Sequence, residues 1–465
     1  MIERLLGDIA RMAGGTLADA ALADRPVKGV SKDTRTLAEG NLYVPIIGGA
    51  FDGHDFAEAA LEQGAGGLLW QKDHGSGPAG APLIYVDDAL EALQRLATAY
   101  RRELAVRIVG ITGSNGKTTT KDMTAAVLST SFRVHKTLGN YNNHIGLPLT
   151  LLEMSEDTEI AVLEMGMSGR GEIELLSRLA EPEIAIITNI GEAHLLQLGS
   201  RLEIARAKTE ILAGLQPDGV LVYHGDEPLI REVLPEWDAP DRSYRQVTFG
   251  QGASNDLFPL DLRLTESGTQ MTVNTDPQTP YYIPMLGAHN AVNALAALAV
   301  GRHFGLAATV MAEGLQGLVM TGMRIEVSVA PTGLTVWNDA YNASPTAMRA
   351  ALALLHEAQG FERKYAVLGD MLELGEKEAD FHREIGRGID PAKVDAVYLF
   401  GPLAGYMAEG ALEKFPPERV RHYQDKETLA RELAEAASAQ DVVLIKGSRG
   451  MRMEQVASFL GQLGG

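Results

Sequence analysis

One stretch of the sequence has the residue types of a phosphate-binding loop. It follows the apolar run 106–112, leads into a helical pattern, and reads Gly113-Ser114-Asn115-Gly116-Lys117-Thr118-Thr119. Glycines let backbone N–H groups turn towards phosphate oxygens, a helix N-terminus favours negative charge, and lysine and threonine suit a phosphate and its Mg²⁺. Ile111 stands where the general pattern has its first glycine, and an ordinary glycine-rich turn is the alternative. We predict an ATP phosphate site with Lys117 as its cation and Thr118 as a magnesium ligand.

Two further polar residues follow neighbouring apolar runs. Glu164 comes directly after 160–163, and His194 follows 184–188 across a short turn. In doubly wound sheets, ligands bind at the carboxyl ends of the strands, so both side chains are expected near Thr118. There they could hold one or two Mg²⁺ ions that bridge ATP and substrate. Each alone could equally be a structural hydrogen-bonding residue, whereas the combination with the loop favours a metal site.

Lys208 lies on the apolar face of a predicted helix. The segment 199–203 has a Ser-x-x-Glu capping box, and Lys208 then shares a stripe with Ile204, Ile211 and Leu212. The simpler interpretation is a lysine whose ammonium reaches solvent along an apolar stem. If it is buried instead, its pKa falls and its neutral amine becomes available to carbon dioxide.

The junction before the last third of the chain offers nucleotide contacts. Asn293 lies in the helical segment that follows 287–290, and Arg324 stands just before the second run of strands. An arginine at a domain junction can close on a γ-phosphate as a bidentate clamp, although an interdomain salt bridge is an equal alternative.

A polar loop, 338–345, is a second candidate for nucleotide binding. It contains Asp339, Tyr341 and Asn342, follows a predicted strand, and ends with Ser344 as a helix N-cap and Pro345 at the first helical position. Such a loop could hold ribose and adenine, or it could be a structural turn.

The elements that position these residues indicate an α/β protein. Apolar β-branched runs alternate with helical patterns at 105–188 and again at 334–445, which is typical of mostly parallel sheets covered by helices. The polar segment 254–279 suggests added antiparallel strands, and the first hundred residues form a smaller α/β module that ends in a helix over 89–100. Since 465 residues exceed one ordinary core, we predict three domains, 1–103, 104–326 and 327–465.

Charge and composition narrow the class of protein. The formal net charge of -20 repels nucleic-acid backbones and anionic membrane surfaces, so no nucleic-acid partner is expected. The longest apolar stretch, 291–311, contains Asn293, Arg302 and His303 and is predicted to be a buried helix, not a membrane span. The N-terminus lacks a secretory pattern and there is no cysteine, which makes a cytoplasmic protein the default.

Taken together, the motifs resemble the Mur ligase family, over essentially the whole chain. Several look specifically like the branch that adds the dipeptide D-alanyl-D-alanine. Besides the phosphate loop, the resemblance is carried by Ser31-Lys32-Asp33-Thr34-Arg35, Phe51-Asp52-Gly53-His54, Gly139-Asn140-Tyr141-Asn142-Asn143, Glu164-Met165-Gly166, Ala193-His194, Ala207-Lys208, Asn338-Asp339-Ala340-Tyr341-Asn342, Gly369-Asp370-Met371-Leu372-Glu373-Leu374-Gly375 and Lys446-Gly447-Ser448-Arg449.

The resemblance implies an N-terminal module that holds a UDP-linked muramoyl tripeptide, a central P-loop ATPase domain, and a C-terminal Rossmann-like domain that receives D-alanyl-D-alanine. It implies ATP and Mg²⁺ as cofactors, an acyl-phosphate intermediate, and carbamylation of Lys208 to supply a metal-binding oxygen. Catalytic roles would fall to Lys117, Glu164, His194, Lys208 and Arg324. The muramoyl substrate would contact Ser31, Asp33, Thr34, Arg35, Asn140, Asn142 and Asn143. We expect a monomer.

Three alternatives stay open at this point. The branch that adds a diamino acid typically carries an Asp-Asn-Pro-Arg motif, which this sequence lacks. Folylpolyglutamate synthase shares the central architecture but would not explain the motifs at 31–35 and 139–143. A nucleotide-binding sensor that does not ligate would have little reason to keep Lys117, Glu164, His194 and Lys208 together.

Overall fold

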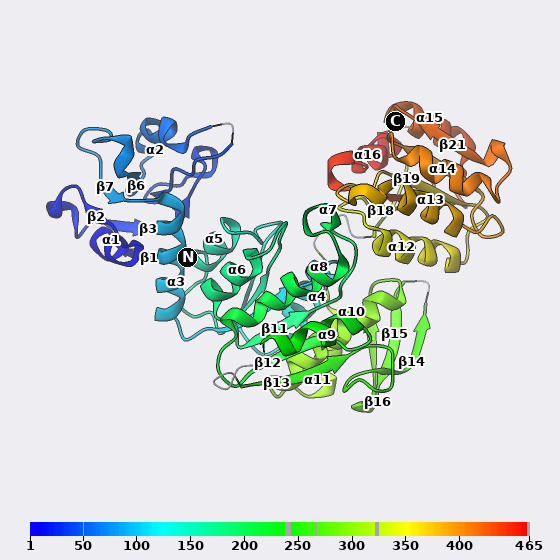
Figure 1. The fold of residues 1–465 in the computed structure, drawn as a ribbon, viewed down its shortest axis with the longest axis horizontal. Coiled ribbons are helices and arrows are strands. Elements are labelled where there is room, and N and C mark those ends of the chain that lie inside the picture. The colour runs from blue at the N-terminus through cyan, green and yellow to red at the C-terminus, as the bar shows by residue number, and fades with distance from the viewer. Residues whose placement is uncertain (50, 238–242, 266, 321–324, 463–465) are drawn as a thin grey trace.

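The structure, a computed structural model, describes residues 1–49, 51–237, 243–265, 267–320 and 325–462. Figure 1 shows a central green domain below, with the blue N-terminal domain at the upper left and the yellow-to-red C-terminal domain at the upper right. The predicted fold class is confirmed, because helices cover sheets that are mostly parallel. In the part of the chain that the structure describes, no helix is long and apolar enough to cross a membrane.

The N-terminal domain has a five-stranded sheet and a two-stranded ribbon, ordered β2-β7-β6-β5-β4 and β1-β3. Its strands are β1 (Glu3–Leu5), β2 (Thr16–Leu17), β3 (Pro26–Lys28), β4 (Val30–Ser31), β5 (Leu42–Tyr43), β6 (Gly67–Gln71) and β7 (Leu83–Val86). Its helices are α1 (Leu6–Ala13), α2 (Ala57–Glu62) and α3 (Ala89–Glu103). Asp88 caps α3 by accepting the N–H of Glu91, and α3 packs against both α1 and the central domain.

The central domain is built on a six-stranded parallel sheet in the order β13-β12-β11-β8-β10-β9. The strands are β8 (Arg107–Thr112), β9 (Val134–Lys136), β10 (Ile160–Glu164), β11 (Ile184–Ile187), β12 (Gly219–His224) and β13 (Tyr244–Phe249). The helices are α4 (Lys117–Ser129), α5 (Gly146–Leu152), α6 (Glu172–Ala180), α7 (Leu195–Leu198), α8 (Arg201–Thr209), α9 (Pro228–Val233), α10 (Ala288–His303) and α11 (Ala308–Gln316). Because β8 lies between β10 and β11, the loops that follow these three strands share one edge.

The polar segment after β13 forms the antiparallel strands that its composition indicated. They are β14 (Pro259–Leu264), β15 (Thr269–Val273) and β16 (Asp276–Ile283), in sequential order. The sheet packs on α10 and α11. Helix α10 is buried along most of its length, so the apolar stretch is a core helix as far as His303, but its remainder forms a connection and the start of α11.

The C-terminal domain has a second six-stranded sheet, ordered β17-β18-β22-β19-β20-β21, in which only β17 is antiparallel. Its strands are β17 (Glu326–Val329), β18 (Thr335–Asp339), β19 (Lys364–Gly369), β20 (Ala396–Phe400), β21 (Val420–Tyr423) and β22 (Val442–Lys446). Its helices are α12 (Pro345–Glu357), α13 (Glu378–Gly388), α14 (Ala404–Leu412), α15 (Lys426–Ala436) and α16 (Glu454–Gln462). Ser344 caps α12 by accepting the N–H of Ala347, with proline at the start of the helix as predicted.

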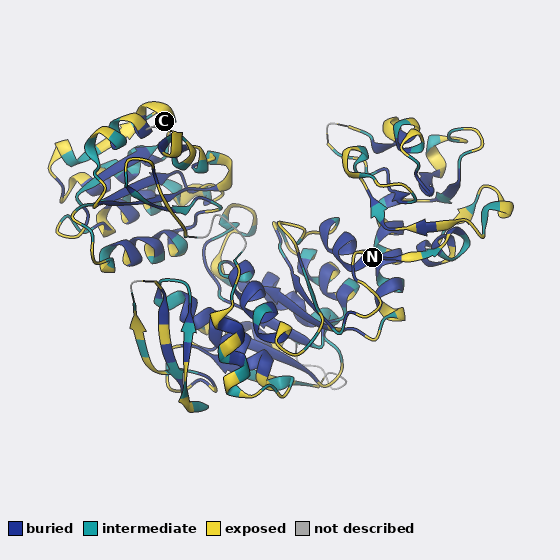
Figure 2. Ribbon diagram, turned by 180° about the vertical axis from the view of Figure 1, so that it is seen from behind, coloured by how far each residue is buried: buried dark blue, intermediate teal, exposed yellow. Residues whose placement is uncertain are grey.

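The cores lie on both faces of the two large sheets. Figure 2 shows their central strands almost entirely dark blue, whereas the three-stranded sheet carries exposed stretches. Strands such as β10 and β11 are buried at every residue, since helices cover both faces, and this is why they read as continuous apolar runs. We propose domain boundaries near residues 103 and 326, because α3 ends at Glu103 and β17 begins at Glu326.

Candidate active site

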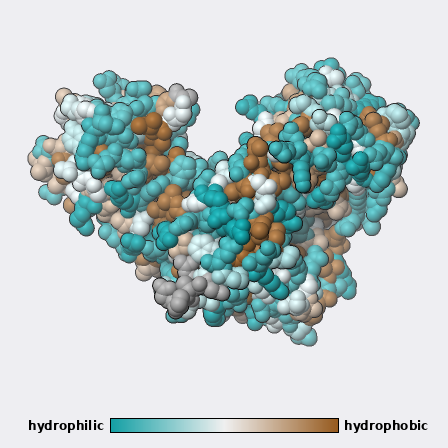
Figure 3. Space-filling model, viewed as in Figure 1, coloured by the Kyte–Doolittle hydropathy of each residue, from teal (hydrophilic) through white to brown (hydrophobic). Residues whose placement is uncertain are grey.

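A cavity of about 670 Å³ opens where the central and C-terminal domains meet. Its walls come from the loops at the shared strand edge, from the start of α10, and from the loop and helix after β18. Figure 3 shows the wide notch above the central domain, between the N-terminal and C-terminal domains. Predicted residues that line the cavity are Ser114, Asn115, Gly116, Lys117, Thr118, Thr119, Asn142, Asn143, Glu164, His194, Asn293, Asp339, Tyr341 and Asn342.

The phosphate loop is held in a shape that only glycine permits at two positions. Gly113 has φ +147°, and a Cβ there would lie 1.9 Å from the Thr188 hydroxyl oxygen. Gly116 has φ +78°, and a Cβ there would lie 2.7 Å from Oδ1 of Asn293. Close packing at both glycines therefore fixes the loop against β11 and α10, with its backbone free to face a ligand.

Lys117 begins α4 and bends back over the loop. Its Nζ donates to the carbonyl oxygen of Gly113 at 2.8 Å. The hydroxyl oxygen of Ser114 is buried and has no hydrogen-bond partner, although it lines the cavity. A cation and an unsatisfied buried polar atom at the mouth of a strand–loop–helix unit fit a phosphate group.

Glu164 lies at the floor of the cavity and is 3% exposed. One carboxylate oxygen accepts the Thr118 hydroxyl at 2.7 Å, and the other accepts Nδ2 of Asn142 at 2.8 Å. The Glu164 backbone N–H donates to the Thr137 hydroxyl at 3.0 Å. A buried carboxylate beside a threonine hydroxyl and a phosphate loop matches the oxygen ligands that Mg²⁺ prefers, so these residues fit the ion.

His194 lines the same cavity from the loop after β11. Its Nδ1 lies 2.9 Å from Oε2 of Glu373 in the C-terminal domain. Burial, and then the positive charges of Lys208 and Lys117, lower the pKa of His194, so the neutral imidazole, the form that binds metals, is favoured.

Lys208 is buried, being 1% exposed, and it lies near Lys117, which lines the cavity. Burial, followed by the charge of Lys117, lowers its pKa well below the ordinary value. The interpretation as a lysine reaching solvent is therefore wrong, and burial favours the neutral amine more than it would in an exposed lysine.

The C-terminal wall of the cavity is organised by a buried ion pair. Nζ of Lys446 lies 2.6 Å from a carboxylate oxygen of Asp339 and donates to the Asn342 carbonyl at 2.9 Å. Burial lowers the pKa of the neighbouring His289. The Ser344 hydroxyl donates to Oδ1 of Asn115 at 3.2 Å, so this wall contacts the phosphate loop directly.

The other predicted residues lie elsewhere. Ser31, Asp33, Thr34 and Arg35 lie in the N-terminal domain at the end of β4, where Asp33 accepts both the N–H and the side chain of Arg35. Asn140 lies in an exposed turn and does not line the cavity. Arg324 falls outside the described residues.

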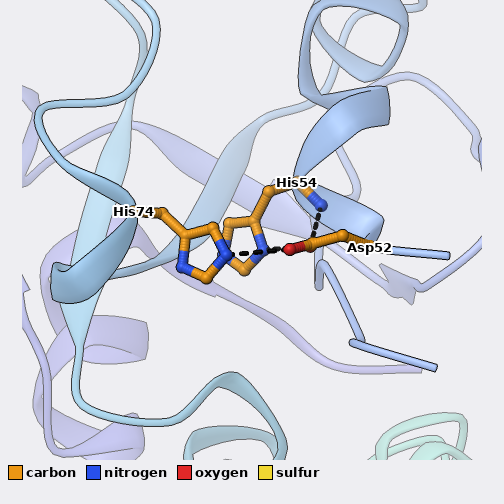
Figure 4. Close-up of side chains that lie close together, drawn as sticks. All are labelled: Asp52, His54 and His74. Atoms are coloured by element: carbon orange, nitrogen blue, oxygen red, sulfur yellow. Dashed lines mark hydrogen bonds and ion pairs between the residues drawn. The ribbon is translucent and has the colours of Figure 1, made fainter. Parts of the chain in front are cut away.

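A second cluster of ionisable groups lies in the N-terminal domain (Figure 4): Asp52, His54 and His74. Nδ1 of His54 and Nε2 of His74 lie 2.7 and 2.8 Å from the two carboxylate oxygens of Asp52. The N–H of Gln71 donates to Nε2 of His54, so the proton of a neutral ring is on Nδ1 and leaves no lone pair there for a metal. The geometry therefore favours a structural network over a metal site.

Several residues that shape the site carry no local sequence signal. Thr188 and Asn189 both donate to the carbonyl of Asn115 and so hold the phosphate loop in place. Glu373, which faces His194, is 179 residues away from it in sequence. The strand-end rule could have identified Asn189, because it follows β11 directly; the pairing with Glu373 requires the domain arrangement.

Comparison with known proteins gives three family matches along the chain. They are the Mur ligase family catalytic domain at 26–101, the Mur ligase middle domain at 111–301, and the Mur ligase glutamate ligase domain at 323–449. The chain is also 50% identical over 460 residues to the UDP-N-acetylmuramoyl-tripeptide--D-alanyl-D-alanine ligase of Bacillus subtilis, covering 99% of each chain. The chain belongs to the Mur ligase family.

Solved structures of Mur ligases share the whole arrangement. MurF from Acinetobacter baumannii matches with a TM-score of 0.89 at 27% identity, covering 99% of both chains. MurF from Thermotoga maritima, solved in complex with ADP, matches with a TM-score of 0.81 at 30% identity, covering 94% of this chain and 97% of that one. The cavity of this Mur ligase is lined by both its middle and its C-terminal regions.

Proposed function

We propose that this protein joins D-alanyl-D-alanine to UDP-N-acetylmuramoyl-tripeptide, using ATP and releasing ADP and phosphate, in the synthesis of the bacterial cell-wall precursor. The observation that carries the proposal is the 50% identity to the Bacillus subtilis ligase of that name over the full length of both chains. The ADP complex of the similar Thermotoga maritima enzyme supports ATP as the nucleotide.

The cavity suits a reaction in two steps. The terminal carboxylate of the tripeptide attacks the γ-phosphorus of ATP, which forms an acyl phosphate and releases ADP. The amine of D-alanyl-D-alanine then attacks the acyl carbon, loses a proton, and displaces phosphate. Lys117 and the loop 113–119 would hold the phosphates and stabilise the charge that develops on the transferring group.

Three side chains would hold Mg²⁺, namely Thr118, Glu164 and His194. When bound, the ion would neutralise phosphate charge and align the carboxylate with the γ-phosphate. Lys208 would add an oxygen ligand as a carbamate, formed when its neutral amine adds to carbon dioxide and a proton leaves. Its burial, its lowered pKa and the nearby charge of Lys117 support this role.

Different parts of the chain would hold the two nucleotide substrates. The UDP-muramoyl part would be held by Ser31, Asp33, Thr34, Arg35, Asn140, Asn142 and Asn143. The nucleoside of ATP would be held by Asn293, Asp339, Tyr341 and Asn342, with Arg324 on the γ-phosphate. We propose that the enzyme works in the cytoplasm, as a monomer.

Release of ADP, measured with each substrate omitted in turn, tests the proposal. We expect steady release only when ATP, UDP-muramoyl tripeptide and D-alanyl-D-alanine are all present. A sensor that does not ligate would bind the precursor without steady release, and a diamino-acid-adding ligase would turn over with the dipeptide precursor and a diamino acid instead.

A further inference from the structure

A loop of the C-terminal domain contacts His194, one of the proposed Mg²⁺ ligands of the central domain. Oε2 of Glu373, from the loop after β19, lies 2.9 Å from Nδ1 of His194, from the loop after β11. Beside this pair, the backbone N–H of Leu196 donates to the carbonyl of Glu373 at 3.0 Å. The side chain of Glu373 therefore contacts the first residue of the segment 194–196, and its main chain contacts the last.

Both partners have an unusual backbone. His194 has φ +64° and Glu373 also has φ +64°, in the left-handed region that favours glycine. A non-glycine residue in that region is strained, and it persists where the surroundings require it. Two such residues facing each other across a domain interface point to a function for the pair.

The pair is poorly suited to a purely stabilising role. The Glu373 side chain is 51% exposed and that of His194 is 24% exposed. Exposed ion pairs contribute little to stability, which would not offset the backbone strain at both residues. The orientation of the imidazole is the feature that the contact controls.

That orientation suits a metal ligand. When Nδ1–H donates to Glu373, the proton of the neutral ring is fixed on Nδ1, and the lone pair is on Nε2. The ring lines the cavity and lies near Lys208 and Lys117. Histidines that bind metals usually donate their other N–H to a carboxylate, which sets the tautomer and raises the basicity of the ligating nitrogen.

We infer that Glu373 is a positioning residue for His194, and that docking of the C-terminal domain completes the cation site of the central domain. The inference rests on the proposed function. It means that the domain that delivers the amine also prepares the site where the carboxylate is activated, so tight Mg²⁺ binding requires both domains in place.

Binding of Mn²⁺, a paramagnetic substitute for Mg²⁺, tests this directly. Electron paramagnetic resonance would measure the Kd of Mn²⁺ for the full-length protein with β,γ-methylene-ATP. Glu373→Ala should raise that Kd about 10-fold or more, and Glu373→Gln should raise it less because its amide oxygen still accepts Nδ1–H. Turnover of Glu373→Ala should recover as Mg²⁺ is raised, which a general structural defect would not produce.

Two further variants make the test specific. Glu376→Gln is the matched control, since Glu376 is exposed in the same loop and forms no ion pair among the described residues; its Kd should equal that of wild type. In a His194→Ala background, Glu373→Ala should change the Kd less than about twofold, because its effect passes through the imidazole.

The result that would overturn the inference is a folded Glu373→Ala protein with the Mn²⁺ affinity of wild type. An equal loss with and without His194 would overturn it as well. If the wild-type protein bound Mn²⁺ through the pair but made no ligation product, the proposed function would fail and the positioning role would stand.

Discussion

Buried or half-buried ionisable residues gather in two places, around the cavity between the central and C-terminal domains and in the N-terminal cluster of Asp52, His54 and His74. The two groups differ in how many of their polar atoms have hydrogen-bond partners. In the cluster, the two oxygens of Asp52 are each paired with an imidazole, and His74 also contacts Asp73. In the cavity, the Ser114 hydroxyl is buried without a partner, and Lys208 is buried close to the cavity-lining residues Lys117 and Glu164.

The difference separates a binding site from a structural network. Buried polar groups are normally satisfied, so those that are not, and that face a cavity, indicate where a ligand binds. Asp52, His54 and His74 bring three possible ligand atoms within 4.8 Å of one another, although hydrogen bonds already engage these side chains. Proximity of ionisable groups alone is therefore a weaker sign of function than unused bonding capacity.

The largest effect should come from Lys117→Ala. This change removes the cation that faces the phosphates, while the Gly113 carbonyl it now contacts can bind water instead. We expect ADP release to fall about 1,000-fold or more, with the melting temperature nearly unchanged. Lys393→Ala removes an exposed lysine of the C-terminal domain and should leave the rate unaltered; turnover close to wild type in a folded Lys117→Ala protein would refute the placement of the ATP site.

Lys208→Ala should be the next most damaging change. Loss of a carbamate oxygen near Lys117 should lower turnover on the order of 100-fold, and a short-chain carboxylate in the medium should partly restore it. Lys121 is the control, because it is equally buried but its Nζ donates to the Thr137 carbonyl at 2.9 Å. Lys121→Met should destabilise the protein without rescue by carboxylate. A bicarbonate-grown, substrate-bound crystal with an unmodified Lys208 far from any metal would contradict the carbamate.

A smaller effect is expected from Asp52→Asn. The change removes the negative charge that both imidazoles of the cluster face, so the melting temperature should fall by a few degrees, corresponding to about 1 kcal/mol. Turnover of the folded protein should stay within about twofold of wild type, measured below the transition. A loss of Zn²⁺ binding on this substitution would instead show that the cluster is a metal site.

The smallest effect should be the pH dependence of the difference in stability between wild type and Asp52→Asn. Burial raises the pKa of Asp52, but hydrogen bonds from His54 and His74 outweigh it and bring the pKa from 3.8 to about 2. Hydrogen bonds to Asp52 and Asp73 raise the pKa of His74 above 6.5. The carboxylate therefore stabilises above pH 3.8 and loses its contribution as pH falls towards 2, whereas His74 stabilises below pH 6.5 and loses its contribution as pH rises. Melting curves of wild type and Asp52→Asn should differ most between these limits.

Much of the fold could be predicted because short stretches of sequence indicate its strands and helix starts. The runs at β8, β10, β11, β18, β19, β20 and β22 are continuous and apolar, and Ser200 and Ser344 cap their helices as their positions indicated. Strands β9, β12, β13, β17 and β21 were not predicted. Several of these lie at sheet edges and carry polar residues, as in β21, where Arg421 and His422 are exposed, so their periodicity is weak.

The sequence identified many residues of the site, but it could not show which of them contact one another. The sequence placed Glu164 at a strand end close to Thr118 of the phosphate loop, and the structure adds their hydrogen bond. The burial of Lys208 could not be decided from its helical stripe, because an apolar face can also carry a lysine that reaches solvent. The pairing of His194 with Glu373 depends on how two domains meet, which no local pattern records.

Competition between amines tests the central claim most directly. The full-length protein would be given ATP, UDP-muramoyl tripeptide, and equal concentrations of D-alanyl-D-alanine, D-alanine and a diamino acid, and the product mass would be measured. The dipeptide carboxylate lies one residue away from the reacting amine, so the site must have a group that pairs with it there. When a single amino acid binds, its carboxylate cannot reach that group, which is left unpaired. We predict that the product gains the mass of the dipeptide alone. A product carrying a single D-alanine or the diamino acid would contradict the assignment.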